Sequence, residues 1–498
     1  MYFIGIDLGT SACKLLLMDE AGAIVRVTSR AYGVEYPHPG WSQQDPADWW
    51  RAVREGVPEL LAGLDASQVV GIGCGGQMHG LVALDKNDEV IRPAILWNDG
   101  RTVEQVRYLN ETVGTSRLLE LTGNIAYAGF TAPKVLWMRD EESELFARIA
   151  HVMLPKDYVN HLLTGAYATD VSDASGTLLF DVERRTWSAE MLGLCGLTES
   201  QMPEVHESYE PIGTLLPEVA AELGLPTGVV VAAGAGDNAA AAVGTGAVGA
   251  GAVGAGTMNI SLGTSGTVFI PTAGFAAGVG DRIHSFCHAD GAWHLMGCIL
   301  SAASCNAWWV NDVLGADDMA AEQADIDVRS ADPSLPYFLP YLMGERTPHN
   351  DVTARGALVG MSMSTTRADL TRAVLEGVAF AVRDSVEIAR SLGASVSSST
   401  VCGGGARSVT WLQMLADILG IELVLPATEQ GPGYGGAMLA AVAAGVYDNV
   451  AACSDAIVAE RERIVPSCDL AAAYDDRYRV WRGMYPALRE SFSEIAGR

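Results

Sequence analysis

Basic residues are scarce in this chain, and no run of them occurs. The 498 residues include 32 Lys and Arg against 60 Asp and Glu, which gives a formal net charge of −28. Binding to the phosphates of a nucleic acid or to an anionic membrane surface requires a basic surface. The composition therefore excludes both classes of protein. A polyanionic substrate such as ATP would need Mg²⁺, backbone N–H groups and a few lysines at its site.

Other sequence features are also missing. The nine cysteines form no C-x-x-C pair, so they indicate buried thiols in a reducing compartment, not a zinc site or a disulfide framework. No basic segment precedes an apolar one at the N-terminus, and the apolar stretch 229–253 is rich in Ala and Gly and contains Asp237. We therefore expect a cytoplasmic protein without a membrane span. No G-x-x-x-x-G-K-[ST], H-R-D or H-E-x-x-H motif occurs.

The length predicts two domains, because 498 residues exceed what one hydrophobic core usually serves. The segment 244–256 is the one stretch of low complexity, and it repeats Gly-Ala-Val-Gly-Ala-Gly almost perfectly. We place the domain boundary in this segment, which gives domains 1–247 and 248–498.

The phrase Leu-Gly-Thr-Ser occurs twice, at 8–11 and at 262–265, about half the chain apart. Each copy lies between two apolar segments, so each predicts a strand, a tight turn and a second strand. Such a turn offers unpaired backbone N–H groups and two hydroxyls, which suits phosphate oxygens. The repeat predicts two similar lobes that enclose one polyphosphate, with candidate ligands in both turns (Thr10, Ser11, Gly263 and Thr264).

Strands, glycine turns and helices recur in both halves of the chain. Residues 1–35 predict a β-meander, 69–74 and 229–233 predict buried strands, and a helix is expected from Ala239. In the second half we expect a strand at 399–402 and helices at 369–392, 409–419 and 435–444. This alternation predicts α/β layers with parallel pairing.

Two acidic residues follow or end predicted strands. Asp7 could hold Mg²⁺, directly or through water, or it could stabilise the adjoining turn. Asp237, in Gly236-Asp237-Asn238, could be a general base that takes a proton from an attacking hydroxyl. It could equally be a helix N-cap.

Two glycine-flanked segments are further candidates. Gln77-Met78-His79 combines an amide, an apolar surface and an imidazole, which suits a polyol, although a single His in a turn is often structural. The run Gly403-Gly404-Gly405 permits close backbone approach, but alone it is weak evidence for a nucleotide.

Taken together and in this order, these blocks resemble the FGGY carbohydrate kinases from Gly5 to about Ala444. The segments 129–137 and 356–376 look like the diagnostic segments of that family. Within it, five segments are similar to the xylulokinase branch (76–80, 93–101, 154–158, 236–238 and 344–349). Glycerol kinases typically have Gln where Asn238 stands.

The resemblance implies an α/β, two-lobed actin/hexokinase-like (ribonuclease H-like) fold with a central cleft. It also implies ATP-dependent phosphorylation of D-xylulose to D-xylulose 5-phosphate. It assigns a base (Asp237), sugar contacts (Met78, His79, Asp237 and Asn238), a Mg²⁺ ligand (Asp7), a contact to the terminal phosphates (Thr264) and contacts to the nucleoside (Gly404 and Gly405).

Several alternatives stay open at this point. The substrate could be another ketose or a polyol, or the chain could be an actin- or chaperone-like ATPase that works by changing conformation. The polar pair Asp237-Asn238 with Gln77-Met78-His79 favours a sugar kinase. The repeat 244–256 is longer than the family usually carries before its second hairpin. A homodimer is the commonest closed assembly, but the sequence does not decide the oligomeric state.

Overall fold

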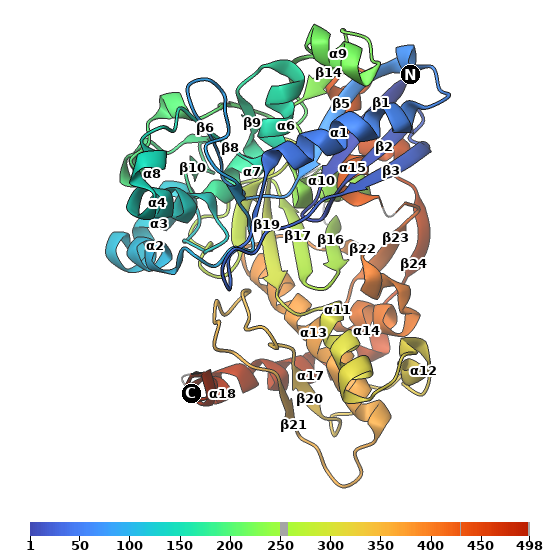
Figure 1. Ribbon diagram of the computed structural model, residues 1–498. Helices are drawn as coiled ribbons and strands as arrows, with labels where there is room; N and C mark the ends of the chain where they lie inside the picture. Colours follow the sequence, from blue (N-terminus) through green and yellow to red (C-terminus); the bar gives the residue numbers. More distant parts are fainter. Residues whose placement is uncertain (250–256, 429, 497–498) are drawn as a thin grey trace.

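A computed structural model describes residues 1–249, 257–428 and 430–496. The first half of the chain forms one large mixed sheet, seen in blue to green in Figure 1. Its strands, in spatial order, are β13 (Pro211–Thr214), β14 (Val230–Ala232), β5 (Val69–Gly76), β1 (Tyr2–Leu8), β2 (Ala12–Asp19) and β3 (Ile24–Ala31), with β15 (Ala235–Gly236) beside β5.

The second half forms a second large mixed sheet, which lies below the first in Figure 1. Its strands, in spatial order, are β18 (His284–Cys287), β19 (Trp293–Ile299), β17 (Gly266–Thr272), β16 (Thr257–Leu262), β22 (Ser398–Cys402), β23 (Glu422–Pro426) and β24 (Glu460–Ile464). Part of the predicted Gly/Ala repeat, residues 250–256, lies outside the described residues.

The two sheets share one plan. In the first, β3-β2-β1 is an antiparallel meander, and β5 and then β14 continue in parallel from β1. In the second, β19-β17-β16 is the meander, and β22 and then β23 continue in parallel from β16. The two Leu-Gly-Thr-Ser phrases occupy equivalent meander turns. The predicted two-lobed α/β fold is confirmed, with mixed rather than purely parallel sheets.

Two helices pack against each other where the lobes join. Helix α10 (Asp237–Thr245) belongs to the first half of the chain, and α15 (Gly431–Ala443) to the second. Helix α15 also packs on β1 and β5 of the first sheet. Both contacts depend on glycine. Where α15 packs on β1, a Cβ at Gly5 would lie 1.8 Å from the carbonyl oxygen of Gly433. Where α15 packs on α10, a Cβ at Gly435 would lie 1.8 Å from the carbonyl oxygen of Ala240.

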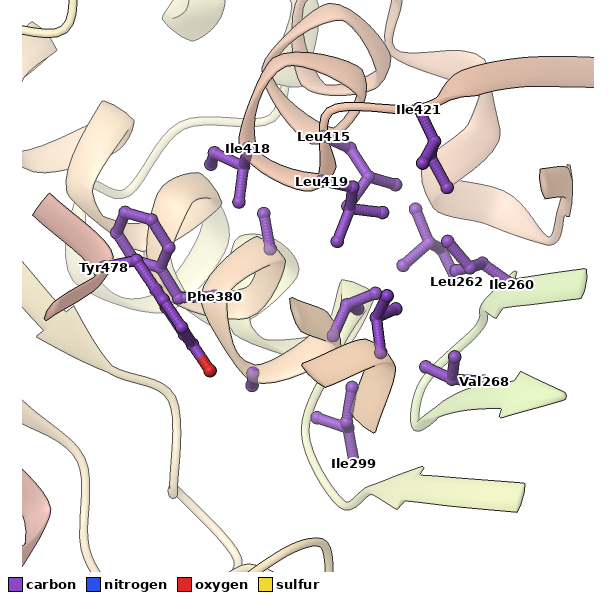
Figure 2. Close-up of a cluster of buried hydrophobic side chains, with 14 of the residues drawn as sticks. Ile260, Leu262, Val268, Ile299, Phe380, Leu415, Ile418, Leu419, Ile421 and Tyr478 are labelled. Carbon is purple, nitrogen blue, oxygen red and sulfur yellow. The ribbon is translucent and has the colours of Figure 1, made fainter. Parts of the chain in front are cut away.

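Long helices cover the outer faces of both sheets and close the hydrophobic cores. Helix α1 (Pro46–Leu61) packs on β2 and β3, and α13 (Arg367–Ser391) packs on β17 and β19. Figure 2 shows part of the second-lobe core, in which Phe380 of α13 lies beside Tyr478, and Leu415 of α14 (Val409–Leu419) lies beside Leu419. The remaining longer helices are α3 (Thr115–Thr122), α4 (Thr131–Glu141), α6 (Pro155–Thr164), α8 (Ala189–Cys195), α9 (Pro217–Leu223), α16 (Val450–Ile457), α17 (Ala471–Arg482) and α18 (Met484–Ala496).

Two predicted helix starts differ from the structure. Helix α10 begins at Asp237, not Ala239, because Gly236 has extended backbone angles (φ −56°, ψ 146°) and the helix starts directly after it. A carboxylate in the first turn is favoured by the helix dipole. Helix α15 begins at Gly431, not Gly435, and has Pro in its first turn, where a missing N–H costs nothing.

In the described part of the chain, no helix has the length and apolarity needed to cross a membrane.

Candidate active site

Asp237 lies at the N-terminus of α10, on the side of the first lobe that faces the second. Its Oδ1 accepts hydrogen bonds from the Asn238 backbone N–H (2.7 Å) and from Asn238 Nδ2 (2.9 Å). Among the described residues, only Asn238 hydrogen-bonds this carboxylate. Since Gly236 occupies the cap position, Asp237 is the first helical residue, and the one helical N–H group that its carboxylate accepts is that of Asn238. Oδ2 is therefore left for a ligand.

Asp7 lies near Asp237, at the end of β1. Burial raises the pKa of Asp7 to about 6, an effect that Lys14 on the neighbouring strand opposes. Burial also raises the pKa of Asp237 to about 7, and the charge of Asp7 adds to the increase, while the hydrogen bonds from Asn238 oppose it. Two carboxylates thus share one poorly solvated region, and Asp237 has a pKa suited to proton transfer near neutrality.

His79 sits in a strained turn that the surrounding residues hold in place. Its φ is +70°, and its carbonyl oxygen accepts hydrogen bonds from Lys134 Nζ (2.7 Å) and Thr131 Oγ1 (3.1 Å). Its Nδ1 lies 2.7 Å from the carbonyl oxygen of Gly176. A carbonyl cannot donate, so Nδ1 carries the proton and Nε2 is an acceptor. Burial, assisted by the charge of Lys134, lowers the pKa of His79 to about 3, and the ring is neutral.

Met78 precedes His79 and packs against the turn that carries Asp237. It is 5% exposed, and a Cβ at Gly236 would lie 2.9 Å from its sulfur. The adjoining Gln77 is buried and turned away, because its backbone N–H donates to the Leu8 carbonyl oxygen at 2.9 Å and its Nε2 donates to Gln44 Oε1 at 3.1 Å. Of the predicted sugar contacts, the structure therefore places Met78 against Gly236, next to Asp237, and the His79 ring against Gly176 and Phe130, whereas Gln77 is bonded elsewhere.

The second lobe contains a large cavity of about 1130 Å³. Both glycine motifs predicted for the nucleotide line it, Gly263 and Thr264 from the turn between β16 and β17, and Gly404 and Gly405 from the turn after β22. Those two turns touch, since a Cβ at Gly403 (φ +89°) would lie 2.7 Å from the Leu262 carbonyl oxygen. The rest of the wall includes Trp308, Asn311 and Arg407.

A smaller cavity of about 210 Å³ lies between the lobes and holds Asp237 and Asn238. Gly403 lines this cavity, and its neighbour Gly404 lines the larger one. The glycine turn after β22 therefore separates the two spaces. A polyphosphate that rests on this turn would point its end toward Asp237.

The first-lobe hairpin is arranged differently from its second-lobe counterpart. Thr10 Oγ1 accepts a hydrogen bond from Trp97 Nε1 (2.9 Å) and lies 3.3 Å from Gln77 Oε1. Neither Thr10 nor the exposed Ser11 lines the two cavities described above. The structure thus brings Gly263, Thr264, Gly404 and Gly405 together but leaves the Thr10 hydroxyl bonded within its own lobe.

Sequence reasoning did not identify a buried charge cluster behind the Gly236-Asp237 turn. Lys156 Nζ lies 2.5 Å from Asp157 Oδ1, 2.9 Å from Asp170 Oδ1 and 3.8 Å from Asp173 Oδ2, and all four side chains are inaccessible to solvent. The link to the turn is Ser172, whose Oγ donates to Asp170 Oδ2 (2.5 Å) and accepts the N–H of Gly236 (3.1 Å). One cation thus holds three carboxylates beside the candidate base.

Lys156 and Asp157 lie in segment 154–158, one of the segments that look like xylulokinase. That resemblance was the one sequence signal that pointed to this cluster. Burial raises the pKa of Asp173 well above its usual value, which the charge of Lys156 opposes. Asp237 contributes to the same shift, so Asp173 and Asp237 lie within electrostatic reach of each other. Sequence spacing could not show this proximity, since 64 positions separate the two residues.

The model of the FGGY carbohydrate kinase N-terminal domain matches residues 2–244, and that of the C-terminal domain matches residues 258–444. The chain belongs to the FGGY family of carbohydrate kinases. A kinase of this family uses ATP as phosphoryl donor, which fits a cavity lined by glycine turns beside the cavity that holds the Asp237 carboxylate.

Individual members of the FGGY family resemble the chain over its whole length. Xylulose kinase of Escherichia coli (strain K12) is 43% identical, and the match covers 98% of this chain and 99% of that protein. The crystal structure of xylulose kinase from Rhodospirillum rubrum has a TM-score of 0.91 at 30% identity, covering 99% and 100% of the two chains. Gluconate kinase from Lactobacillus acidophilus has a TM-score of 0.92 at 25% identity, covering 99% of each chain.

Proposed function

We propose that this FGGY kinase phosphorylates D-xylulose at its terminal hydroxyl, using ATP, and releases D-xylulose 5-phosphate and ADP. The observation that carries the proposal is the position of Asp237 in the cavity between the lobes. The glycine turn that borders the larger cavity also lines this one at Gly403, and Met78 packs against Gly236, next to Asp237. The 43% identity to a xylulose kinase supports the choice of sugar.

In the proposed mechanism, Asp237 accepts the proton of the attacking sugar hydroxyl through its free Oδ2. A sugar hydroxyl is a weak nucleophile, so phosphoryl transfer depends on placing it in line with the terminal phosphate. Asn238 holds Oδ1 through two hydrogen bonds and so fixes the direction of the carboxylate. We assign Asn238 this orienting role in addition to the predicted contact with the sugar.

Neutral His79 and apolar Met78 form the proposed sugar-facing surface. With its proton on Nδ1, His79 offers Nε2 as an acceptor for a sugar hydroxyl, and Met78 offers apolar contact to the carbon chain. Lys134 and Thr131 act indirectly, because their hydrogen bonds hold the carbonyl of His79 in its strained turn.

For the nucleotide, we propose that Gly263 and Thr264 contact the terminal phosphates and that Gly404 and Gly405 lie against the nucleoside. Their backbone positions border one cavity. Thr10 and Ser11 remain candidate phosphate ligands only for an arrangement in which the first-lobe hairpin approaches the nucleotide more closely.

The residues present fit a magnesium ion that arrives with ATP. Mg²⁺ is usually held by one or two carboxylates together with substrate phosphates. Asp7 and Asp237 provide two half-buried carboxylates whose mutual repulsion a cation would relieve. No cluster of three or more metal-binding side chains occurs among the described residues, which is compatible with a metal that needs the nucleotide. We propose Asp7 as the holding residue, and the ion would neutralise phosphate charge.

We keep three further assignments as proposals. The lobes divide near residue 247, although α15 returns to pack on the first sheet. The compartment is the cytoplasm, and the protein is a monomer or a homodimer. A conformational ATPase of the actin or chaperone type is not retained, because the chain belongs to a carbohydrate kinase family.

A panel of sugars in a coupled ADP-release assay tests the proposed function. D-Xylulose should give the highest kcat/KM when compared with other ketoses, pentitols, glycerol and gluconate. Phosphorus NMR of the product should show a monoester on the terminal carbon. Turnover of glycerol or gluconate at a kcat/KM equal to that of D-xylulose would contradict the choice of substrate.

A further inference from the structure

The second lobe places one arginine against the sugar-facing surface of the first. Arg346 lies on the segment between β20 (Tyr337–Leu339) and β21 (Ala357–Val359). Its guanidinium carbon is 5.2 Å from the ring centroid of Tyr127, a first-lobe residue. The charge of Arg346 also contributes to lowering the pKa of His79 and of His284, so both imidazoles lie within its electrostatic reach.

The surroundings of this guanidinium are aromatic and neutral. The ring centroid of Tyr127 is 5.3 Å from that of Phe130, and Phe130 stacks on His79 at 4.7 Å. From the second lobe, His284 packs on Tyr127 at 4.9 Å. Residues of both lobes therefore surround the Arg346 guanidinium and the His79 ring.

The backbone on either side of Arg346 is fixed. Glu345 Oε1 accepts the backbone N–H groups of Arg346 (2.7 Å) and Leu300 (3.0 Å). Thr347 is tied to Cys298 by two hydrogen bonds of 3.0 Å, one from its N–H and one to its Oγ1. A side chain held this firmly at its base can point to one place without a large loss of entropy on binding.

Arg346 is half-buried, and the carboxyl group within its electrostatic reach is that of Glu345, whose pKa burial raises to about 8, an effect that Arg346 opposes. Among the described residues, none forms an ion pair with it, and its polar side-chain contact is with the thiol of Cys298. Cys298 in turn lies within electrostatic reach of Asp237. A buried or half-buried guanidinium usually has a carboxylate partner, so its free donors indicate a ligand acceptor at this end of the site.

The chemistry of a 2-ketopentose supplies such an acceptor. Closing the ring of D-xylulose uses the oxygen on carbon 5 to attack the carbonyl carbon, so that oxygen carries a free hydroxyl only in the open chain. A kinase that phosphorylates the terminal hydroxyl must therefore bind the open-chain sugar, which has a ketone at carbon 2. The ketone oxygen accepts hydrogen bonds and donates none.

We infer that Arg346 is a specificity residue that binds the ketone oxygen of the open-chain sugar while Asp237 receives the terminal hydroxyl. This inference rests on the proposed function. In this arrangement Arg346 offers only hydrogen-bond donors to the ketone oxygen. Asp237 offers an acceptor to the terminal hydroxyl. His79 Nε2, an acceptor, suits a hydroxyl between them.

The experiment compares D-xylulose with xylitol, in which a CH–OH group replaces the ketone. The variants are Arg346→Met, Arg346→Lys and, as a control, Arg329→Met, which removes an exposed arginine of the same lobe. The measurements are KM and kcat for D-xylulose, the inhibition constant of xylitol against D-xylulose, KM for ATP and the melting temperature. Because inhibition is measured, xylitol need not be turned over.

We expect Arg346→Met to raise KM for D-xylulose by about tenfold or more, since a hydrogen bond to a charged donor is lost. The xylitol inhibition constant should change by less than about threefold, because a hydroxyl gains less from a charged donor. For Arg346→Lys, KM for D-xylulose should lie between the values of the wild type and of Arg346→Met. Arg329→Met should have the wild-type KM. KM for ATP should not change.

Two results would overturn the inference. Equal fold-increases in KM for D-xylulose and in the inhibition constant of xylitol would mean that Arg346 only shapes the site. A fall in kcat with a changed KM for ATP and unchanged sugar constants would mean that the guanidinium serves the phosphate. A wild-type protein that turned over polyols but not D-xylulose would contradict the proposed function itself, and the inference with it.

Discussion

The two lobes share a strand plan but differ at equivalent positions. The residue before Leu8 in the first meander is Asp7, and the residue before Leu262 in the second is Ser261. The helix after the last parallel strand begins with Asp237 in α10 and with Gly431 in α15. The two lobes thus have the same strand plan, but at these two equivalent positions only the first lobe has acidic residues.

This difference shows how one frame can serve two chemical tasks. A base and a metal ligand need carboxylates, whereas a polyphosphate is repelled by them. With Asp7 and Asp237 in the first lobe, the second lobe can present glycine turns and hydroxyls to the anion. The carboxylates of the first lobe and the polyphosphate bound by the second would meet in the cleft between the lobes. Exclusion of water from that cleft would protect ATP from hydrolysis.

The largest expected effect comes from removing the proposed base of the first lobe, Asp237. Asp237→Asn keeps the shape of the side chain but cannot accept a proton. We expect kcat to fall by about 10²–10⁴-fold, the usual loss for a general base. Steady-state kinetics at saturating ATP and sugar measures this change, and the melting temperature and the Kd for ATP should stay close to wild type. A wild-type kcat would make Asp237 a structural residue.

Next in size is the comparison of two buried ion clusters, one taken from each lobe. In the first lobe Lys156 holds three aspartates beside the Gly236-Asp237 turn, and in the second Glu376 is held by Arg372 (2.7 Å) and Arg477. Breaking a buried pair costs about 3–5 kcal/mol, because it leaves a charge without a partner. Lys156→Met and Glu376→Gln should both lower the free energy of unfolding in denaturant titrations.

Only the first-lobe variant should also affect catalysis. Lys156→Met leaves Asp170 and Asp173 uncompensated beside Asp237, so kcat of the folded enzyme should fall. Glu376→Gln should leave kcat unchanged at a temperature where the protein stays folded. Equal kcat values for the two variants would show that the cluster behind the turn is structural only.

A third prediction places an acid in the second lobe, at the position equivalent to Asp7. Ser261 lines the cavity that contains Asp237. Ser261→Asp should raise KM for ATP by about 10–100-fold, because like charges placed together cost several kcal/mol when poorly solvated. Ser261→Asn is the matched control and should change KM much less. If both variants behaved alike, charge would not explain the difference between the lobes.

The smallest expected effect compares the two Leu-Gly-Thr-Ser turns. Thr264 faces the nucleotide cavity, whereas the Thr10 hydroxyl is bonded to Trp97 and Gln77. Thr264→Ala should raise KM for ATP by roughly 2- to 12-fold, which corresponds to one lost hydrogen bond of about 0.5–1.5 kcal/mol. Thr10→Ala should leave it nearly unchanged. A larger effect at Thr10 would indicate that the first-lobe turn approaches ATP during the reaction.

Much of this arrangement could be predicted from the sequence, because it depends on local patterns. The repeated phrase identified two equivalent hairpins, and strand-to-glycine turns located Asp237 and Gly404. The start of α10 at Asp237 was missed, since the helix signal of the alanines that follow is stronger than that of an acid after glycine. Lys156, Asp173 and Arg346 reach the site through tertiary packing, which no sequence spacing records.

The central claim, that the Asp237 carboxylate acts as the base, is tested most directly by the pH dependence of kcat/KM for D-xylulose. A base works when deprotonated, and the pKa of Asp237 is raised to about 7. Activity should therefore fall about tenfold per pH unit below about 7 in the wild type, and more steeply once Asp7, with a pKa of about 6, is also protonated. In Asp237→Asn the small residual activity should lack this acid limb. An acid limb near pH 7 that persisted in the Asn variant would contradict the account.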